Sequence, residues 1–309
     1  MKIRMMLTFK RSFCAFLMLS MVTLLPAGDV EFPLIQSMSY FPYSELTLLD
    51  RSDVSLSLGL YYSNVYMFER SGEVTPVIND FEVSSPTLEF RYGLLKGVTL
   101  EIFYRISSVF GGELDKLIEN FHDSFNLPDN QRPKYPRNSV HYKYRDYFQY
   151  YQRKSFVSPL VFSCLAGIVD SPGFSLKSRL ALGIPTAEMP GFVSSKSFLT
   201  TGLILGFGGE KFHLDMSAYL SFFKQPQWLE DVDMSSQIFL ADIRLGLGRF
   251  MAGFLYRTSP FKEGDIAHDA RQLYVGYRFG KSVELILFED LAPFDTSPDI
   301  SVSLRFKLL

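Results

Sequence analysis

The sequence predicts an all-β protein, a transmembrane antiparallel up-and-down β-barrel of about 12 strands with a long, partly helical extracellular loop. Three observations predict this fold. Apolar and polar residues alternate in segments of about ten residues through most of the chain. Short and long connections between these segments also alternate. The chain begins with a stretch that is typical of an export signal.

Residues 1–27 are expected to be a secretory signal peptide. They combine four basic residues with the apolar run 13–25 and the small residue Ala27, where cleavage can occur. A transmembrane anchor is the alternative, but a membrane-spanning helix needs about 20 apolar residues. Removing the segment takes the formal charge from -2 to -6. A mildly acidic chain without a basic patch argues against a nucleic-acid partner, and we expect export to the bacterial outer membrane.

Cysteine usage and hydrophobicity fit the same class. Cys14 lies in the expected signal, so Cys164 remains alone and no intramolecular disulfide is possible. A closed barrel does not need one, because it pairs its backbone groups internally. Hydrophobic residues make up 47% of the chain, yet no later apolar run is long enough for a membrane helix. In a barrel the apolar residues stand at every second position instead.

The chain after the signal divides into a lead-in and a barrel. Residues 28–52 contain prolines and no sustained period, and we expect a periplasmic lead-in that could tuck into the barrel mouth. The barrel is expected to occupy residues 53–309. Its predicted strands are 53–66, 82–93, 97–107, 157–169, 174–184, 196–208, 211–223, 235–247, 249–258, 269–280, 282–290 and 299–308.

The connections between these strands are of two kinds. The tight ones mostly contain glycine or proline, as short turns require; they are 94–96, 170–173, 208–210, 247–248 and 280–281. The longer ones are 67–81, 108–156, 185–195, 224–234, 259–268 and 291–298. Short periplasmic turns and long external loops are typical of outer-membrane barrels with both termini inside. A soluble sandwich would share the period of two but would not predict this alternation.

The last predicted strand shows the pattern clearly and is expected to close the barrel on the first strand. Its apolar residues stand at even positions and its polar residues at odd ones: Ile300, Val302, Leu304, Phe306 and Leu308 alternate with Ser301, Ser303, Arg305 and Lys307.

Residues 108–156 form the longest connection, and loops of that size are usually functional or disordered. Apolar residues at helical spacing predict a short amphipathic helix ending before Pro128, and residues 140–151 are assigned to a hairpin. One hypothesis is that the loop forms a lid or constriction over the pore, or binds a ligand with its tyrosines. The other is that the helix packs on the rim and the tyrosines form the interfacial girdle. The residues singled out here are Phe121, His122, Asp123, Phe125, Tyr142 and Tyr144.

Charged residues on the polar faces of the strands are expected to line the lumen. The basic ones are Arg91, Arg105, Lys177, Arg179, Lys211, Arg244, Arg278, Arg305 and Lys307, and the acidic ones are Glu89, Glu101, Asp215, Asp242 and Glu284. The excess of four positive charges would favour anions entering a channel. Eight strands leave room only for side chains whereas sixteen or more enclose an aqueous channel. With about twelve, we favour a lumen that is at least partly filled by salt-bridged side chains.

No catalytic, metal or cofactor signature stands out, and we assign no catalytic residues, metal ligands or cofactor. His122 and Asp123 are adjacent, and adjacent residues on a helix point apart. His213 and Asp215 share a strand face, but a third partner is not identifiable. The sequence therefore favours a non-enzymatic role and leaves an enzyme in the barrel wall as the alternative.

Several stretches of the chain resemble a known family. They are Phe32–Leu34, Leu60–Asn64, Leu88–Leu94 and, above all, Asn120–Pro128 with its Phe-His-Asp-x-Phe motif, together with the ending Phe288–Leu291. On these residues the chain resembles the uncharacterised bacterial outer-membrane family called domain of unknown function 3187. The resemblance implies a barrel and no assigned activity, so it supplies no site residues. The chain departs from such barrels at its tip, where Leu308 and Leu309 stand in place of the usual aromatic end.

The functional prediction is a monomeric outer-membrane barrel that acts as a narrow, porin-like channel or transporter for small polar or anionic solutes. One alternative is a barrel-embedded enzyme that acts on lipid or lipopolysaccharide, with His122 or His213 as base. The other is a surface protein that binds a partner through its loops. The chain is expected to contact outer-membrane lipid, lipopolysaccharide and the barrel-assembly machinery. The sequence does not specify the solute or whether the lumen is open.

Overall fold

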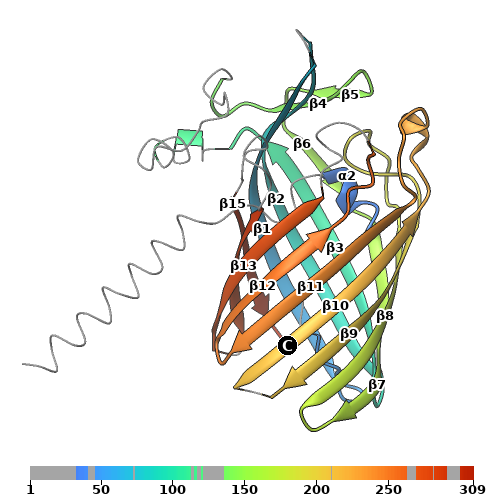
Figure 1. The fold of residues 1–309 in the computed structure, drawn as a ribbon, viewed down its shortest axis with the longest axis vertical. Coiled ribbons are helices and arrows are strands. Elements are labelled where there is room, and N and C mark those ends of the chain that lie inside the picture. Colours follow the sequence, from blue (N-terminus) through green and yellow to red (C-terminus); the bar gives the residue numbers. More distant parts are fainter. Residues whose placement is uncertain are drawn as a thin grey trace, which may run out of the picture.

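The computed structural model describes residues 33–40, 46–71, 74–112, 115–116, 120, 136–209, 211–262, 269–280, 282–290 and 300–309. The expected signal, 1–27, lies outside this range. Most of the described residues belong to one antiparallel sheet that closes on itself (Figure 1). Within the described residues, no helix combines the length and the apolar character that crossing a membrane requires.

Twelve strands form the closed barrel, as predicted. They are β1 (Val54–Ser71), β2 (Val74–Leu95), β3 (Val98–Phe110), β7 (Leu160–Ser171), β8 (Phe174–Ile184), β9 (Phe198–Gly208), β10 (Phe212–Phe223), β11 (Gln237–Leu247), β12 (Phe250–Arg257), β13 (Ala270–Phe279), β14 (Val283–Asp290) and β15 (Ile300–Lys307). Each pairs with its neighbours in chain order. The last strand, β15, closes the barrel on β1 with Ser57 opposite Lys307 and Ser63 opposite Ser301.

The alternation of residues along each strand sets which face is apolar. On β1, Leu58 and Leu60 are exposed on the outside, while Ser57 is buried on the inside. On β8, Leu180 and Leu182 are exposed and Arg179 is buried. Because a one-residue shift would exchange the two faces of a strand, this pattern fixes the register. The outside is therefore an apolar belt and the inside is polar.

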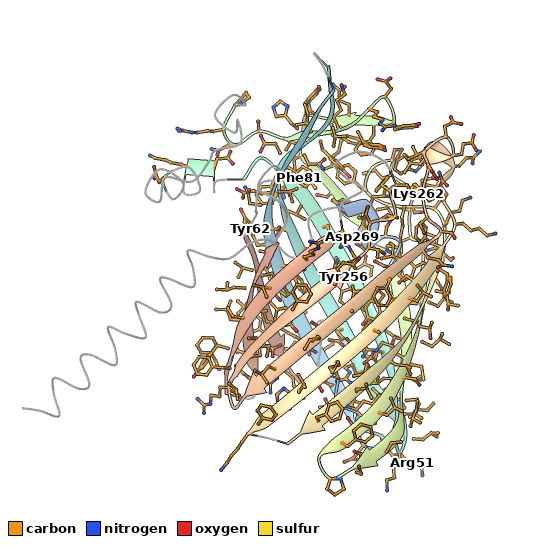
Figure 2. The ribbon with its side chains drawn as sticks, in the orientation of Figure 1. Arg51, Tyr62, Phe81, Tyr256, Lys262 and Asp269 are labelled. Carbon is orange, nitrogen blue, oxygen red and sulfur yellow. The ribbon has the colours of Figure 1, made fainter. Side chains whose placement is uncertain are left out.

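The two ends of the barrel differ, as the connections predict. The turns β2–β3, β7–β8, β9–β10, β11–β12 and β13–β14 are short and lie at one end. Figure 2 shows Arg51 at this end and Phe81 toward the opposite one. By analogy with outer-membrane barrels the short turns mark the periplasmic end.

The prediction of a long loop at 67–81 is wrong. In the structure β1 and β2 continue through this region as a paired hairpin, with Met67 opposite Asn79 and Ser71 opposite Val74. The hairpin rises beyond the barrel wall (Figure 1). A run of strand-forming residues such as Val74, Val77 and Ile78 lets the ladder extend past the membrane belt.

The structure does not support a long, partly helical loop at 108–156. Its described part contains β4 (His141–Tyr144), β5 (Phe148–Tyr150) and β6 (Lys154–Val157). The expected hairpin at 140–151 is present as β4–β5, and β4 pairs with the extension of β2. Tyr142 and Tyr144 of this stretch pair with Asn79 and Val77 of β2. Of the predicted helix, Phe121, His122, Asp123 and Phe125 lie outside the described residues.

The described part of the expected lead-in lies inside the barrel. It begins with the short helix α2 (Pro33–Gln36), and Leu34 and Met38 are fully buried. The backbone N–H of Ser194, in the long β8–β9 connection, donates to Ser37 Oγ at 3.0 Å. Toward the periplasmic end, Leu49 N–H donates to Thr99 Oγ1 at 2.8 Å. The described residues 33–40 and 46–52, which we call the N-terminal segment, therefore lie in the lumen, the first part at the loop end and the second toward the short-turn end.

Candidate functional site: the barrel lumen

The loop end of the lumen is covered by aromatic side chains. The ring of Tyr142 on β4 lies 4.9 Å from Phe81, 4.7 Å from Phe148 and 4.9 Å from Phe192, measured between ring centroids. Its hydroxyl donates to the backbone carbonyl of Gly191. Burial raises the pKa of the Tyr142 phenol well above its usual value.

This cluster, which we call the aromatic cap, joins loops from opposite sides of the barrel. Phe148 contacts Trp228 of the β10–β11 loop, with ring centroids 5.9 Å apart. Tyr144 contacts Phe261 of the β12–β13 loop at 5.5 Å. Tyr150 donates through its hydroxyl to the carbonyl of Pro190 at 3.0 Å. Because β11 stands opposite β2 in the ring of strands, the β4–β5 hairpin crosses the mouth of the barrel.

The middle of the lumen holds a buried charge network. Glu101 Oε1 accepts from Arg91 Nε and from Arg179 Nη2, each at 3.1 Å. Its other oxygen accepts from the hydroxyl of Ser163 at 3.0 Å. The side chains of the three charged residues are at most 1% exposed. Arg91 also donates to the backbone carbonyl of Thr47, which ties the N-terminal segment to the network.

A further ion pair and a hydrogen-bonded group of three side chains lie on other strands of the wall. Arg305 on β15 donates to Glu89 on β2 at 2.6 Å, across the strand that lies between them. On the β11 side, Tyr274 donates to Asp242 Oδ1 at 2.7 Å and Arg244 Nε donates to the Tyr274 hydroxyl at 3.1 Å. These contacts pair charged and polar side chains inside the lumen.

A glycine makes room for the side chain of Tyr274, which bonds to Asp242 and Arg244. Gly253 lies opposite both Arg244 and Tyr274 in the ladder. A Cβ there would lie 2.2 Å from Cζ of the Tyr274 ring, a distance that real contacts do not show. The missing side chain therefore allows the tyrosine to lie flat across the neighbouring strand and reach Asp242.

At the periplasmic end a cavity of about 320 Å³ remains between the N-terminal segment and the wall. Its polar lining includes Lys177, His213, Asp215, Arg244 and Arg278. Residues of the short turns also line it, so it lies at the mouth of the barrel. Lys177 Nζ donates to the backbone carbonyl of Leu46 in the N-terminal segment at 2.7 Å.

The remaining residues expected in the lumen differ in exposure. Arg105 is buried with its guanidinium 5.2 Å from the centroid of the Phe103 ring. Arg278 pairs with Glu284 at 3.2 Å, and its side chain is 37% exposed. Lys307 is half-buried, whereas Lys211 is exposed at the start of β10. The expected loop residues Tyr142 and Tyr144 are buried in the aromatic cap instead of presented to solvent.

The two strand residues considered for catalysis share one cavity. His213 and Asp215 both line the periplasmic cavity, and the His213 ring lies over Gly246. Within the part of the chain that the structure describes, no three metal-binding side chains gather at one place.

Sequence reasoning missed several lumen residues. Tyr219 and Tyr274 stand on the polar faces of their strands and are buried. Their positions in the alternation were the available signal, because an aromatic residue on the polar face of a barrel strand must lie in the lumen. Tyr40, in the N-terminal segment, could not be placed by any strand pattern.

Residues 30–156 match the model of a family described as "Protein of unknown function (DUF3187)". The predicted resemblance is confirmed over this range. A search of curated protein sequences found no match.

Solved structures are similar to this chain. The COG4313 outer membrane channel from Pseudomonas putida F1 is 12% identical, with a TM-score of 0.52 over 87% of this chain and 99% of that one. Omp33 of Acinetobacter baumannii is 10% identical, with a TM-score of 0.38 over 82% and 99%. Outer membrane phospholipase A from Escherichia coli is 11% identical, with a TM-score of 0.38 over 91% and 99%. The first of these likenesses shows that the fold is that of an outer-membrane β-barrel.

Proposed function

We propose that the protein resides in the bacterial outer membrane and acts as a narrow channel or transporter for small polar solutes, anions among them. Its apolar belt would contact lipid and lipopolysaccharide. We expect a monomer that is inserted by the barrel-assembly machinery.

The observation that carries the proposal is the way in which the lumen is closed. The N-terminal segment is not part of the sheet, and three of its anchors are single hydrogen bonds: those made by Ser37, Leu46 and Leu49. A net hydrogen bond contributes about 0.5–1.5 kcal/mol. Because none of its described residues belongs to a barrel strand, the segment can move without breaking one, and its movement would join the periplasmic cavity to the upper lumen.

The chemistry of the lumen supports a polar solute. Lys177, Arg244 and Arg278 line the cavity together with Asp215 and the backbone of the short turns. An interior that holds hydrogen-bonding groups of both signs replaces the hydration shell of a small polar solute, and its basic excess favours anions.

The aromatic cap supports regulated passage. It crosses the extracellular mouth, and ring contacts join its β4–β5 hairpin to the β8–β9, β10–β11 and β12–β13 loops. These contacts can separate while β4 stays paired with β2. A solute would enter when the cap opens and would leave past the displaced N-terminal segment.

Planar bilayer recording tests the proposal. We expect brief or small current steps from the full chain and larger, sustained steps from a variant that lacks residues 33–40. Heat-dependent gel mobility, which reports on folded barrels, controls for the integrity of both proteins. Two folded proteins that both fail to conduct would refute the channel.

A further inference from the structure

The centre of the barrel contains buried donor atoms without a protein partner. Arg179 uses only Nη2, on Glu101, while its Nε and Nη1 atoms have no hydrogen-bond partner. The hydroxyl of Tyr40 in the N-terminal segment is also buried without one. The Arg179 side chain is 0% exposed. Buried polar groups in proteins are normally hydrogen-bonded, so a group left unpaired indicates a bound water or ion.

The charges around these atoms are unequal. Glu101 is shared by Arg91 and Arg179. The other nearby carboxylate, Glu89, is bound by Arg305. Among the described residues Glu101 is the one carboxylate that pairs with Arg179, and its charge is divided between Arg179 and Arg91. A buried charge needs a counter-charge, because transfer from water to a low-dielectric interior strongly disfavours an isolated ion.

The wall is shaped to bring a second phenol to the same place. Gly202 on β9 lies opposite both Arg179 on β8 and Tyr219 on β10. A Cβ at Gly202 would lie 2.2 Å from Cδ1 of Tyr219, so the tyrosine ring lies across the glycine, toward Arg179. Arg179 interacts electrostatically with the phenols of both Tyr219 and Tyr40.

The groups that meet here are donors. A guanidinium group has no acceptor, and a phenol can donate its proton. A ligand of this site must therefore accept hydrogen bonds and carry negative charge. None of these three residues lines the periplasmic cavity, and each is at most 4% exposed, so the ligand must be small.

We propose that the barrel centre binds a monatomic halide ion, chloride in the cell, between Arg179 of β8 and Tyr40 of the N-terminal segment, with Tyr219 at its side. The proposal goes beyond conduction, because the site is a binding site whether or not solutes pass. Since Tyr40 belongs to the N-terminal segment, the ion also ties that segment to the barrel wall.

Bromide identifies the site directly. Crystals of the full chain grown in sodium bromide are expected to show an anomalous peak within hydrogen-bonding distance of the Arg179 guanidinium and the Tyr40 hydroxyl. Density for water alone, or a protein carboxylate such as that of Glu45 at this position, would overturn the proposal.

A solution measurement distinguishes the hydroxyl's role from general damage. Halide binding is followed by the line width of the ³⁵Cl resonance, with gluconate replacing chloride at constant ionic strength. Tyr40→Phe removes one donor and is expected to weaken binding about fivefold to tenfold. The matched control Tyr274→Phe removes a phenol that is hydrogen-bonded to Asp242 and should leave halide binding unchanged. Equal binding by the wild type and Tyr40→Phe would contradict the assignment.

Discussion

Replacing Glu101 by glutamine tests the central charge network most sharply. The substitution keeps the size of the side chain but removes the charge that faces both Arg91 and Arg179. Removing one partner of a buried ion pair costs about 3–5 kcal/mol, because the other charge remains buried and unpaired. Two guanidinium groups are left here, so we expect Glu101→Gln to fall at the upper end of this range.

The assay is equilibrium unfolding by urea in lipid vesicles, followed by circular dichroism of the strands. The control is Asp233→Asn, which breaks the ion pair with Lys262 in the loops. The atoms of that pair are 2.7 Å apart, but both side chains are more than half exposed, and such pairs contribute about 0–1 kcal/mol. If Glu101→Gln loses no more free energy of unfolding than Asp233→Asn, the reasoning about buried charge in the lumen is wrong.

Two further predictions concern packing and the aromatic cap. Gly202→Val places atoms on the Tyr219 ring and is expected to destabilise the barrel by about 1–3 kcal/mol in the same urea titration. The control is Gly209→Ala, whose Cβ would meet nothing within 4 Å and which should leave the free energy of unfolding unchanged. Because the raised pKa of Tyr142 favours its neutral form in the folded protein, its contribution to cap stability is complete below about pH 10 and is lost as the pH rises further. The emission of Trp228, the single tryptophan, should shift to longer wavelength in that range, and a shift of the same size in Tyr142→Phe would exclude Tyr142 as its origin.

Strand positions were predictable because a barrel wall repeats one simple constraint. Each of the predicted strands overlaps an observed strand, and β8 begins and ends at the predicted residues, Phe174 and Ile184. Lipid on one side and a polar lumen on the other impose a period of two on every strand. The same constraint predicts an inner-face position for Arg179 and Asp242, and both are buried.

The predictions failed where that constraint ends. Beyond the membrane belt the pattern no longer distinguishes a loop from a paired hairpin, so the sequence predicts a loop at 67–81 where the structure has a hairpin. The buried positions of Tyr142 and Tyr144 depend on contacts with distant loops, which no local pattern encodes. The course of the N-terminal segment is likewise set by side chains of several strands, such as Lys177 and Thr99.

Locking the N-terminal segment is the measurement that tests the account most directly. The backbone N–H of Ser194 in the β8–β9 loop donates to Ser37 Oγ. These two positions are therefore chosen for a disulfide between segment and loop, with Ser37→Cys and Ser194→Cys made together with Cys164→Ser. We predict that oxidation abolishes the current steps in a planar bilayer and that a reductant restores them, while each single cysteine variant is unaffected. Undiminished steps from a protein whose disulfide is verified by mass spectrometry would contradict a channel closed by its N-terminal segment.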